Sequence, residues 1–294
     1  MLIGYYLPVL IYEPLSYGPL SYEPLIYERL SYGLLITGYQ LRAINYGLSI
    51  TGYQLWIVFT GARCMHQPAL RVGECSLISH RAAVYCGMSG IMGGLLLFMG
   101  DMLLFYAPVA TDKFEVMGHL PAWRIVLSGQ SALLAVSFYV LACGQIQYAF
   151  ETTKKWLRWT VCGSFVFIML AYGVVHGAFI AVAVAAQIAV DLDLPAQALS
   201  DLAVTSNDAI RQLVYPVFGL FSVLFVVAVW TRQTAYPRWL ALCSPATFFV
   251  VREPLVSRLP ENLQSVVDGG YLNLIIVVFF TLASSALWIA RESK

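Results

Sequence analysis

One carboxylate, Asp101, lies inside the apolar run GIMGGLLLFMGDMLLFY (residues 90–106), and one histidine, His176, lies inside a second apolar run that contains AYGVVHGAF. An ionisable group in hydrocarbon costs about 3 kcal/mol even on mild insertion scales, so it marks a site unless it is paired locally. A carboxylate and an imidazole together can exchange a proton, bind a ligand or hold a metal ion.

The spacing of small residues predicts how these two groups are presented. At 100° per residue, Gly90, Gly94 and Asp101 fall within about 40° of one another, so the acid shares a face with a small-xxx-small helix contact. Glycines beside His176 permit a similar close approach. At 1.5 Å per residue, Asp101 lies about 20 Å and His176 about 24 Å from the inner boundary of the membrane. The sequence therefore predicts that they meet in the outer half.

Other predicted helices and their ends bring further polar side chains to a similar depth. These additional cavity candidates are Gln130, Tyr172, Tyr215, Arg252, Glu253 and Asn273. Three interpretations of the cluster stay open. The groups satisfy one another as interhelical contacts, or they form a pathway or site for a ligand, an ion or a proton, or they form a catalytic or metal site.

The catalytic interpretation has a definite form. Asp101, His176 and the loop residue His119 would supply three metal ligands and leave a fourth position for water, as in a zinc hydrolase. Intramembrane ceramidase-like hydrolases use such sets, but their paired histidines on one helix are absent here. Ser128 and Ser131 are interpreted as small packing residues, so no activated nucleophile is predicted. The cofactor stays unknown.

The composition is that of a membrane protein. Hydrophobic residues make up 60% of the chain and charged residues 11%, whereas soluble domains carry about 25% charged residues. The formal net charge is +1 and no basic run is longer than Lys154-Lys155, which excludes a nucleic-acid partner. No CxxC, GxGxxG, GxSxG or HExxH motif is present. The lipid bilayer is the predicted partner, and the sequence leaves the oligomeric state open.

About 20 apolar residues are needed for a helix to cross the hydrocarbon core. Five stretches satisfy this length, and they run over about 88–107, 123–146, 160–187, 212–231 and 271–290. A sixth, at 239–251, is shorter and holds Pro245, so a proline-kinked helix, a broken helix, a re-entrant segment and a tilted span are all open. The sequence predicts an all-α, polytopic transmembrane bundle over residues 88–294.

Basic residues in the loops predict the orientation, because cytoplasmic loops carry the excess of lysine and arginine. Three basic residues precede the third span, whereas the loop after it carries four aspartates. Loops 147–159 and 232–238 are therefore predicted to be cytoplasmic, and loops 108–122 and 188–211 to be outside. Both termini of this multi-pass protein of the cell membrane would then lie in the cytoplasm.

The first 87 residues differ from the rest. The run YEPLSYGPLSYEPLIYERLSYG (residues 12–33) repeats tyrosine every five residues, a period that gives neither a helix nor a strand a continuous apolar face. Residues 1–87 are therefore predicted to be a low-complexity, disordered tail. Three explanations stay open: translated tandem-repeat DNA with the native start at Met88 or Met65, a genuine disordered tail, or a tyrosine-rich binding segment.

The runs GGLLLFMGDMLLFY, YGVVHGAF and YPVFGLFSVLF resemble an uncharacterised family of small bacterial polytopic membrane proteins, from about residue 88 onward. The resemblance implies about six helices and no known substrate or reaction. With the polar candidates, it favours a small-molecule or ion/proton binding or transport cavity in the outer half. The alternatives are a membrane-embedded metal-dependent hydrolase and an accessory membrane subunit.

Overall fold

The computed structural model describes residues 78–106 and 112–292, and every regular element in these ranges is a helix. In chain order the helices are α2 (His80–Phe105), α3 (Lys113–Gly118), α4 (Ala122–Ala149), α5 (Lys155–Asp191), α6 (Ser200–Trp230), η1 (Arg238–Cys243), α7 (Pro245–Val250), α8 (Arg252–Val256) and α9 (Glu261–Glu292). Most of the predicted tail, residues 1–77, lies outside the described residues, as do the explanations offered for it.

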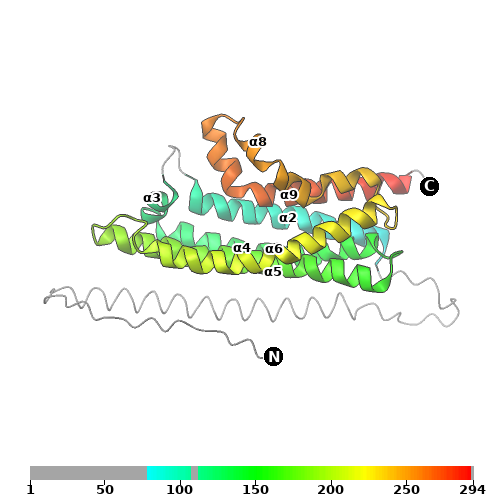
Figure 1. The fold of residues 1–294 in the computed structure, drawn as a ribbon, viewed down its shortest axis with the longest axis horizontal. Helices are drawn as coiled ribbons and strands as arrows, with labels where there is room; N and C mark the ends of the chain where they lie inside the picture. The colour runs from blue at the N-terminus through cyan, green and yellow to red at the C-terminus, as the bar shows by residue number, and fades with distance from the viewer. Residues whose placement is uncertain (1–77, 107–111, 293–294) are drawn as a thin grey trace, which may run out of the picture. The chain divides into compact units, whose positions relative to one another are not determined.

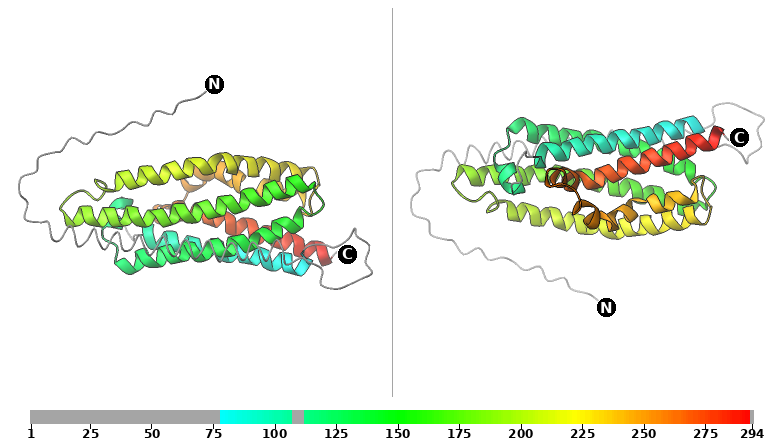
Figure 2. Two further views of the ribbon diagram at one scale, coloured as in Figure 1. Left: turned by 90° about the horizontal axis from the view of Figure 1, so that it is seen from below. Right: turned by 90° about the horizontal axis from the view of Figure 1, so that it is seen from above.

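Five of these helices are long and apolar enough to cross a membrane: α2, α4, α5, α6 and the Val266–Ala290 part of α9. A helix suits hydrocarbon because its backbone amides and carbonyls bond to one another within the segment. Figures 1 and 2 show the five helices running side by side as a bundle. The predicted all-α transmembrane bundle is confirmed at this level.

The predicted sixth span at 239–251 is not one continuous helix, because η1, α7 and α8 take its place. Ser244 has an extended backbone with ψ 150°, and Pro245 begins α7 without an N–H to donate, so η1 cannot continue into α7. The Tyr271 hydroxyl donates a hydrogen bond of 2.7 Å to the Phe248 carbonyl, which satisfies part of the interrupted backbone. Of the alternatives that the sequence leaves open, the structure has the broken helix.

This broken segment carries the chain from one end of the bundle toward the other. At its start, the loop after α6 contacts the loop after α4, where the Ala235 N–H donates to the Ala149 carbonyl at 2.8 Å. At its end, the Arg252 guanidinium of α8 lies 2.6 Å from the Asp268 carboxylate near the start of α9. The segment therefore connects the two ends of the bundle, as a span would, without forming a long helix.

The start of α2 and the end of α9 lie at the same end of the bundle. A Cβ placed on Gly87 of α2 would overlap the Ser284 hydroxyl of α9, so the two helices are antiparallel neighbours. A Cβ on Gly144, near the end of α4, would lie 2.7 Å from the Cys86 sulfur of α2. The two loops predicted to be cytoplasmic therefore share one end with the start of α2 and the end of α9.

Helix α2 begins before the boundary predicted at Met88. Ser79 is its N-cap and accepts a hydrogen bond of 3.3 Å from the Ala82 N–H. Ala83 and Val84 in the first turns are buried in the bundle. The sequence places this stretch in the tail because it lacks apolar periodicity, and the serine cap is the signal that would have corrected the boundary.

The glycine face predicted on α2 packs against α9. A Cβ on Gly90 would overlap the Phe280 ring, and one on Gly94 would lie 2.6 Å from the Val277 side chain. Only a helix without side chains at these positions can approach this closely. The contact brings Asp101, which lies on the same face, to α9.

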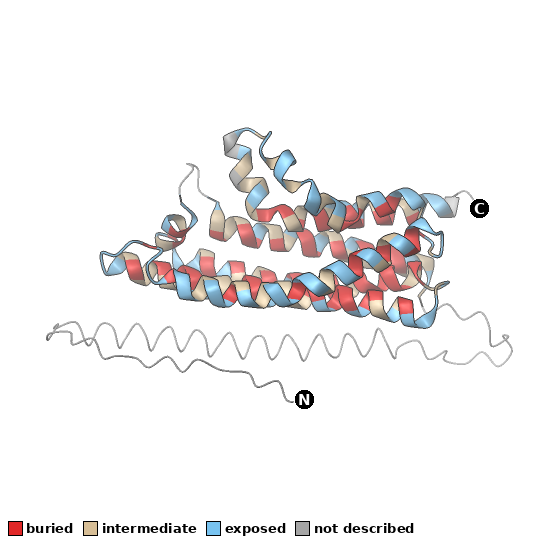
Figure 3. Cartoon of the chain, in the orientation of Figure 1, coloured by how far each residue is buried: buried red, intermediate tan, exposed pale blue. Residues whose placement is uncertain are grey.

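Aromatic side chains fill the end of the bundle that holds the start of α2. The rings of Phe225 and Phe279 have centroids 5.5 Å apart, and Tyr236 lies 6.0 Å from Phe225. Figure 3 shows buried residues along the faces where helices meet and exposed residues on the outer faces. Asp101 lies near the end of α2, away from this aromatic cluster.

Candidate functional site

Asp101 of α2 and His176 of α5 are in direct contact. Asp101 Oδ1 lies 3.0 Å from His176 Nδ1, and both side chains are buried. Asp101 Oδ2 accepts a hydrogen bond of 2.5 Å from the Asn273 amide of α9. Both carboxylate oxygens therefore have a partner inside the bundle, and three separate helices meet at this one group.

The second ring nitrogen of His176 faces a serine of α4. Ser128 Oγ lies 2.8 Å from His176 Nε2 and 2.9 Å from the Gly100 carbonyl oxygen. A hydroxyl has one hydrogen, so Ser128 donates either to the Gly100 carbonyl or to the imidazole, but not to both. When Ser128 donates to Gly100, His176 Nε2 carries a hydrogen and donates to Ser128, and a second proton lies between Nδ1 and Asp101. When Ser128 donates to Nε2, only the proton between Nδ1 and Asp101 is present.

The cluster therefore has two hydrogen-bonded states that differ by one proton. Uptake or release of one proton at the imidazole, together with rotation of the Ser128 hydroxyl, changes one into the other without leaving the imidazole or the carboxylate unpaired. A buried polar group without a partner would cost about 1–3 kcal/mol, so a change of proton number usually disturbs such a site. The geometry of the Asp101–His176–Ser128 cluster thus offers a hydrogen-bond partner to the imidazole and to the carboxylate in both states.

The hydrogen-bonded arrangement of a serine, a histidine and an aspartate is also that of a serine-hydrolase triad. The sequence predicts only a packing role for Ser128, whereas the structure shows it bonded to the histidine. However, Ser128 has no exposed surface and does not line the cavity described below. Its oxygen is therefore out of reach of a substrate, and its role in this conformation is to hold the imidazole.

Tyr139 of α4 orients the amide of Asn273. The tyrosine hydroxyl donates to Asn273 Oδ1 at 3.4 Å, while the amide nitrogen donates to Asp101. The two bonds define which way the amide points. Ser128 and Tyr139 are separated by about three turns on one buried face of α4, and neither is among the site residues predicted from the sequence. Their shared face with Ala132 and Ala135 was the signal that could have found them.

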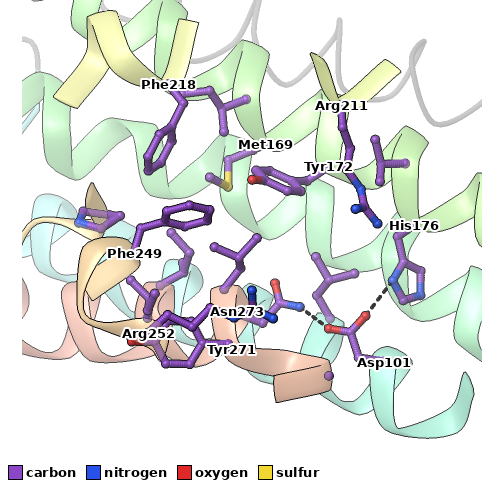
Figure 4. A pocket seen from close by; sticks show the side chains of 18 of the residues that line it. Asp101, Met169, Tyr172, His176, Arg211, Phe218, Phe249, Arg252, Tyr271 and Asn273 are labelled. Atoms are coloured by element: carbon purple, nitrogen blue, oxygen red, sulfur yellow. Dashed lines mark hydrogen bonds and ion pairs between the residues drawn. The ribbon is translucent and has the colours of Figure 1, made fainter. Parts of the chain in front are cut away.

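A cavity of about 440 Å³ opens next to this cluster, between α2, α5, α6, α7 and α9. Six of the eight predicted candidates line it: Asp101, Tyr172, His176, Tyr215, Arg252 and Asn273. Figure 4 labels five of them, all except Tyr215, and shows these side chains converging from different helices. The volume lies in the range of about 300–1,000 Å³ that is typical of small-molecule pockets.

Two predicted candidates, Gln130 and Glu253, are exposed and do not line the cavity. Gln130 follows Ser128 by two positions on α4, which turns it about 200° away from the buried face. Glu253 follows Arg252 by one position on α8, which turns it about 100° away. The membrane depth predicted for these two residues was compatible with the site, but both lie on helix faces that point away from it.

Arg211 lines the cavity, although the sequence indicates only a basic loop residue at this position. Because α6 begins at Ser200 rather than at residue 212, Arg211 is part of the helix and faces inward. Its guanidinium lies 3.4 Å from the Asp208 carboxylate, one turn earlier. Lys113 and Asp268 also line the cavity and were likewise not predicted as site residues.

The metal set that was an alternative for Asp101 and His176 does not come together. His119 is exposed at the end of α3, where its Nδ1 donates to the Glu115 carbonyl at 2.9 Å. Within residues 78–106 and 112–292, no group of three His, Cys, Asp or Glu side chains is placed to hold a metal ion. The contact between Asp101 and His176 remains a two-residue pair with Ser128 and Asn273 as neutral partners.

A family model described as "Family of unknown function (DUF6796)" matches residues 82–288. No curated protein and no solved structure matches the chain. No substrate, reaction or partner is therefore supplied by similarity.

Proposed function

The chain belongs to this family of unknown function, and from that premise we propose that it is a multi-pass membrane protein that binds a small molecule in the cavity beside Asp101 and His176. The proposal rests on the position of the buried, hydrogen-bonded pair Asp101 and His176 on the wall of a cavity. A pair that served helix packing alone would be enclosed on every side by other side chains.

The proton states of the cluster support a ligand-responsive site. A bound molecule that carries charge changes the energy of the two hydrogen-bonded states by different amounts, and so favours one of them. Ser128 and Asn273 keep the cluster satisfied in either state. The site is thus suited to bind a molecule together with, or in exchange for, a proton.

Much of the remaining lining is apolar and suits an organic ligand. Met169, Phe218, Phe249 and Ile276 are among the residues that face the cavity. Such a mixture, an apolar wall with a few convergent polar groups, is the usual composition of a small-molecule site. The proposal is confined to binding and does not include a continuous pathway, because aromatic side chains pack the other end of the bundle.

The proposal is tested by the chemical accessibility of Met169, whose sulfur faces the cavity in Figure 4. The Met169→Cys variant, in phosphatidylcholine nanodiscs, is treated with the small neutral reagent methyl methanethiosulfonate, and modification is followed by peptide mass spectrometry. Native Cys143 and Cys162 are buried and do not line the cavity, so they are internal controls.

We expect position 169 to react while both native thiols stay unmodified. Equal and slow modification of all three thiols would show that small molecules do not enter, and would overturn the proposal.

A further inference from the structure

The arginines that line the cavity have N–H donors beyond those used by their present partners. Arg211 from α6 and Arg252 from α8 both line it, and Figure 4 shows them entering from different sides, Arg211 near Tyr172 and His176 and Arg252 near Tyr271. A guanidinium has five N–H donors and no acceptor. Each arginine can therefore hold its present partner and still donate to a ligand.

Both carboxylates on the cavity wall already have a hydrogen-bond donor. Asp101 accepts from His176 on one oxygen and from Asn273 on the other. The Asp268 carboxylate is held by Arg252 at 2.6 Å. Asp208, the partner of Arg211 at 3.4 Å, is not among the residues that line the cavity.

The spare N–H groups of Arg211 and Arg252 therefore favour a ligand that brings acceptors. The charge count points the same way, since Lys113, Arg211 and Arg252 line the cavity against Asp101 and Asp268. A planar or tetrahedral oxyanion is the group that guanidinium donors recognise most strongly.

We propose, on the basis of the function proposed above, that the ligand is a small organic anion with one carboxylate or phosphate group on an apolar or aromatic body. The oxyanion is held by Arg211 and Arg252, and the body packs on Met169, Phe218 and Phe249. Aromatic acids from water and acyl chains from the bilayer share this chemistry.

The test measures how well probes of matched shape protect the Met169→Cys thiol from methyl methanethiosulfonate in the same nanodiscs. Decanoate, decanol and decyltrimethylammonium share one apolar tail and differ in charge. A second arm compares naphthoate with naphthylmethanol, which separates an aromatic source from an acyl source. Because methyl methanethiosulfonate is neutral, the charge of a bound probe does not change the local concentration of this reagent.

We expect decanoate or naphthoate, whichever binds, to slow modification of the thiol at position 169 about tenfold more than its neutral alcohol does. A charge-assisted hydrogen bond accounts for a difference of this size. Arg211→Met and Arg252→Met should each reduce this advantage. Arg258→Met is the matched control, because Arg258 is exposed and does not line the cavity.

The two proposals fail in different ways. Equal protection by the anionic, neutral and cationic probes, or stronger protection by the cation, would overturn the anion assignment and leave the binding cavity in place. No protection by any probe at a thiol that reacts would also overturn the anion assignment, whereas a thiol at position 169 that reacts no faster than Cys143 and Cys162 would overturn the binding cavity itself. Neither comparison depends on the arginine variants, since the probes are tested first on the chain with native arginines.

Discussion

Asp101 of α2 and His176 of α5 lie 3.0 Å apart with both side chains buried, and Asn273 and Ser128 occupy the remaining hydrogen-bonding positions of the pair. The contact joins helices that come from different parts of the chain. It also lies on the wall of the cavity, so the proposed ligand would contact atoms that join the helices.

The pair should show strong energetic coupling. Removing either partner alone, by Asp101→Ala or His176→Ala, leaves the other buried without its main partner. We expect the double variant to lose less stability than the sum of the single variants, with a coupling of about 0.5–3 kcal/mol. The measurement is the free energy of unfolding in mixed micelles.

The exposed pair Arg252 and Asp268 is the control for this cycle, and we expect a coupling of about 0.2–1 kcal/mol there because water screens it. Additive losses at Asp101 and His176 would mean that the observed contact contributes nothing to stability.

Gly100 is required by the packing around His176. A Cβ at this position would overlap the Ser131 hydroxyl and lie 3.1 Å from His176 Nε2. We therefore expect Gly100→Ala to lower the melting temperature, and Ser131→Ala in the same chain to restore part of it. Gly177→Ala is the matched control, because a Cβ added at Gly177 would meet no neighbouring side chain or helix within 4 Å.

In that control, alanine should stabilise α5 by up to about 1 kcal/mol through helix propensity. A Gly100→Ala protein as stable as Gly177→Ala would contradict the packing described here.

Two buried tyrosines should respond oppositely to loss of the hydroxyl. Tyr139→Phe removes the donor to Asn273, and we expect a loss of about 1–3 kcal/mol from the unpaired amide oxygen. Tyr236 packs on Phe150 and Phe225, and its buried hydroxyl has no partner among the described residues. Tyr236→Phe should therefore be neutral or stabilising. Thermal unfolding of the two variants decides this.

The pH dependence of Tyr236 has a defined sign. Tyr236 lies in the loop after α6, and burial raises the pKa of its hydroxyl well above the ordinary value. A raised pKa means that the neutral form stabilises the fold below the unfolded pKa of about 10, and that this contribution is lost as the pH rises further. Tyr236→Phe should lose less stability than the native chain above that pH. An identical alkaline decline in both proteins would contradict the assignment.

The orientation in the membrane remains a prediction from the basic loops. Lys155→Cys and Asp201→Cys place exposed thiols at opposite ends of the bundle. An impermeant thiol reagent added outside intact cells should modify position 201 and leave position 155 unmodified, because the loop before α5 carries the basic residues. Modification of position 155 alone would reverse the orientation.

The sequence predicts the long helices and the Asp101–His176 contact because both follow from local rules. Apolar length defines the spans, and the angle and rise per residue place both groups on inward faces at similar depth. The break at Ser244 and the exposure of Gln130 were harder to predict from the sequence, because they depend on how neighbouring helices pack. Ser128 was missed for the same reason: a serine in a transmembrane helix has the same local pattern whether it fills space or holds an imidazole.

The most direct test is to locate a bound small molecule by its own scattering. Crystals of the protein soaked separately with para-bromobenzoate and para-bromobenzyl alcohol would report bromine positions by anomalous diffraction, independently of any variant. If the cavity binds small molecules, a bromine peak for at least one probe is expected inside the cavity bounded by Asp101, Met169 and Phe249. Bromine peaks confined to the lipid-facing surfaces, with none inside the cavity, would contradict the proposal.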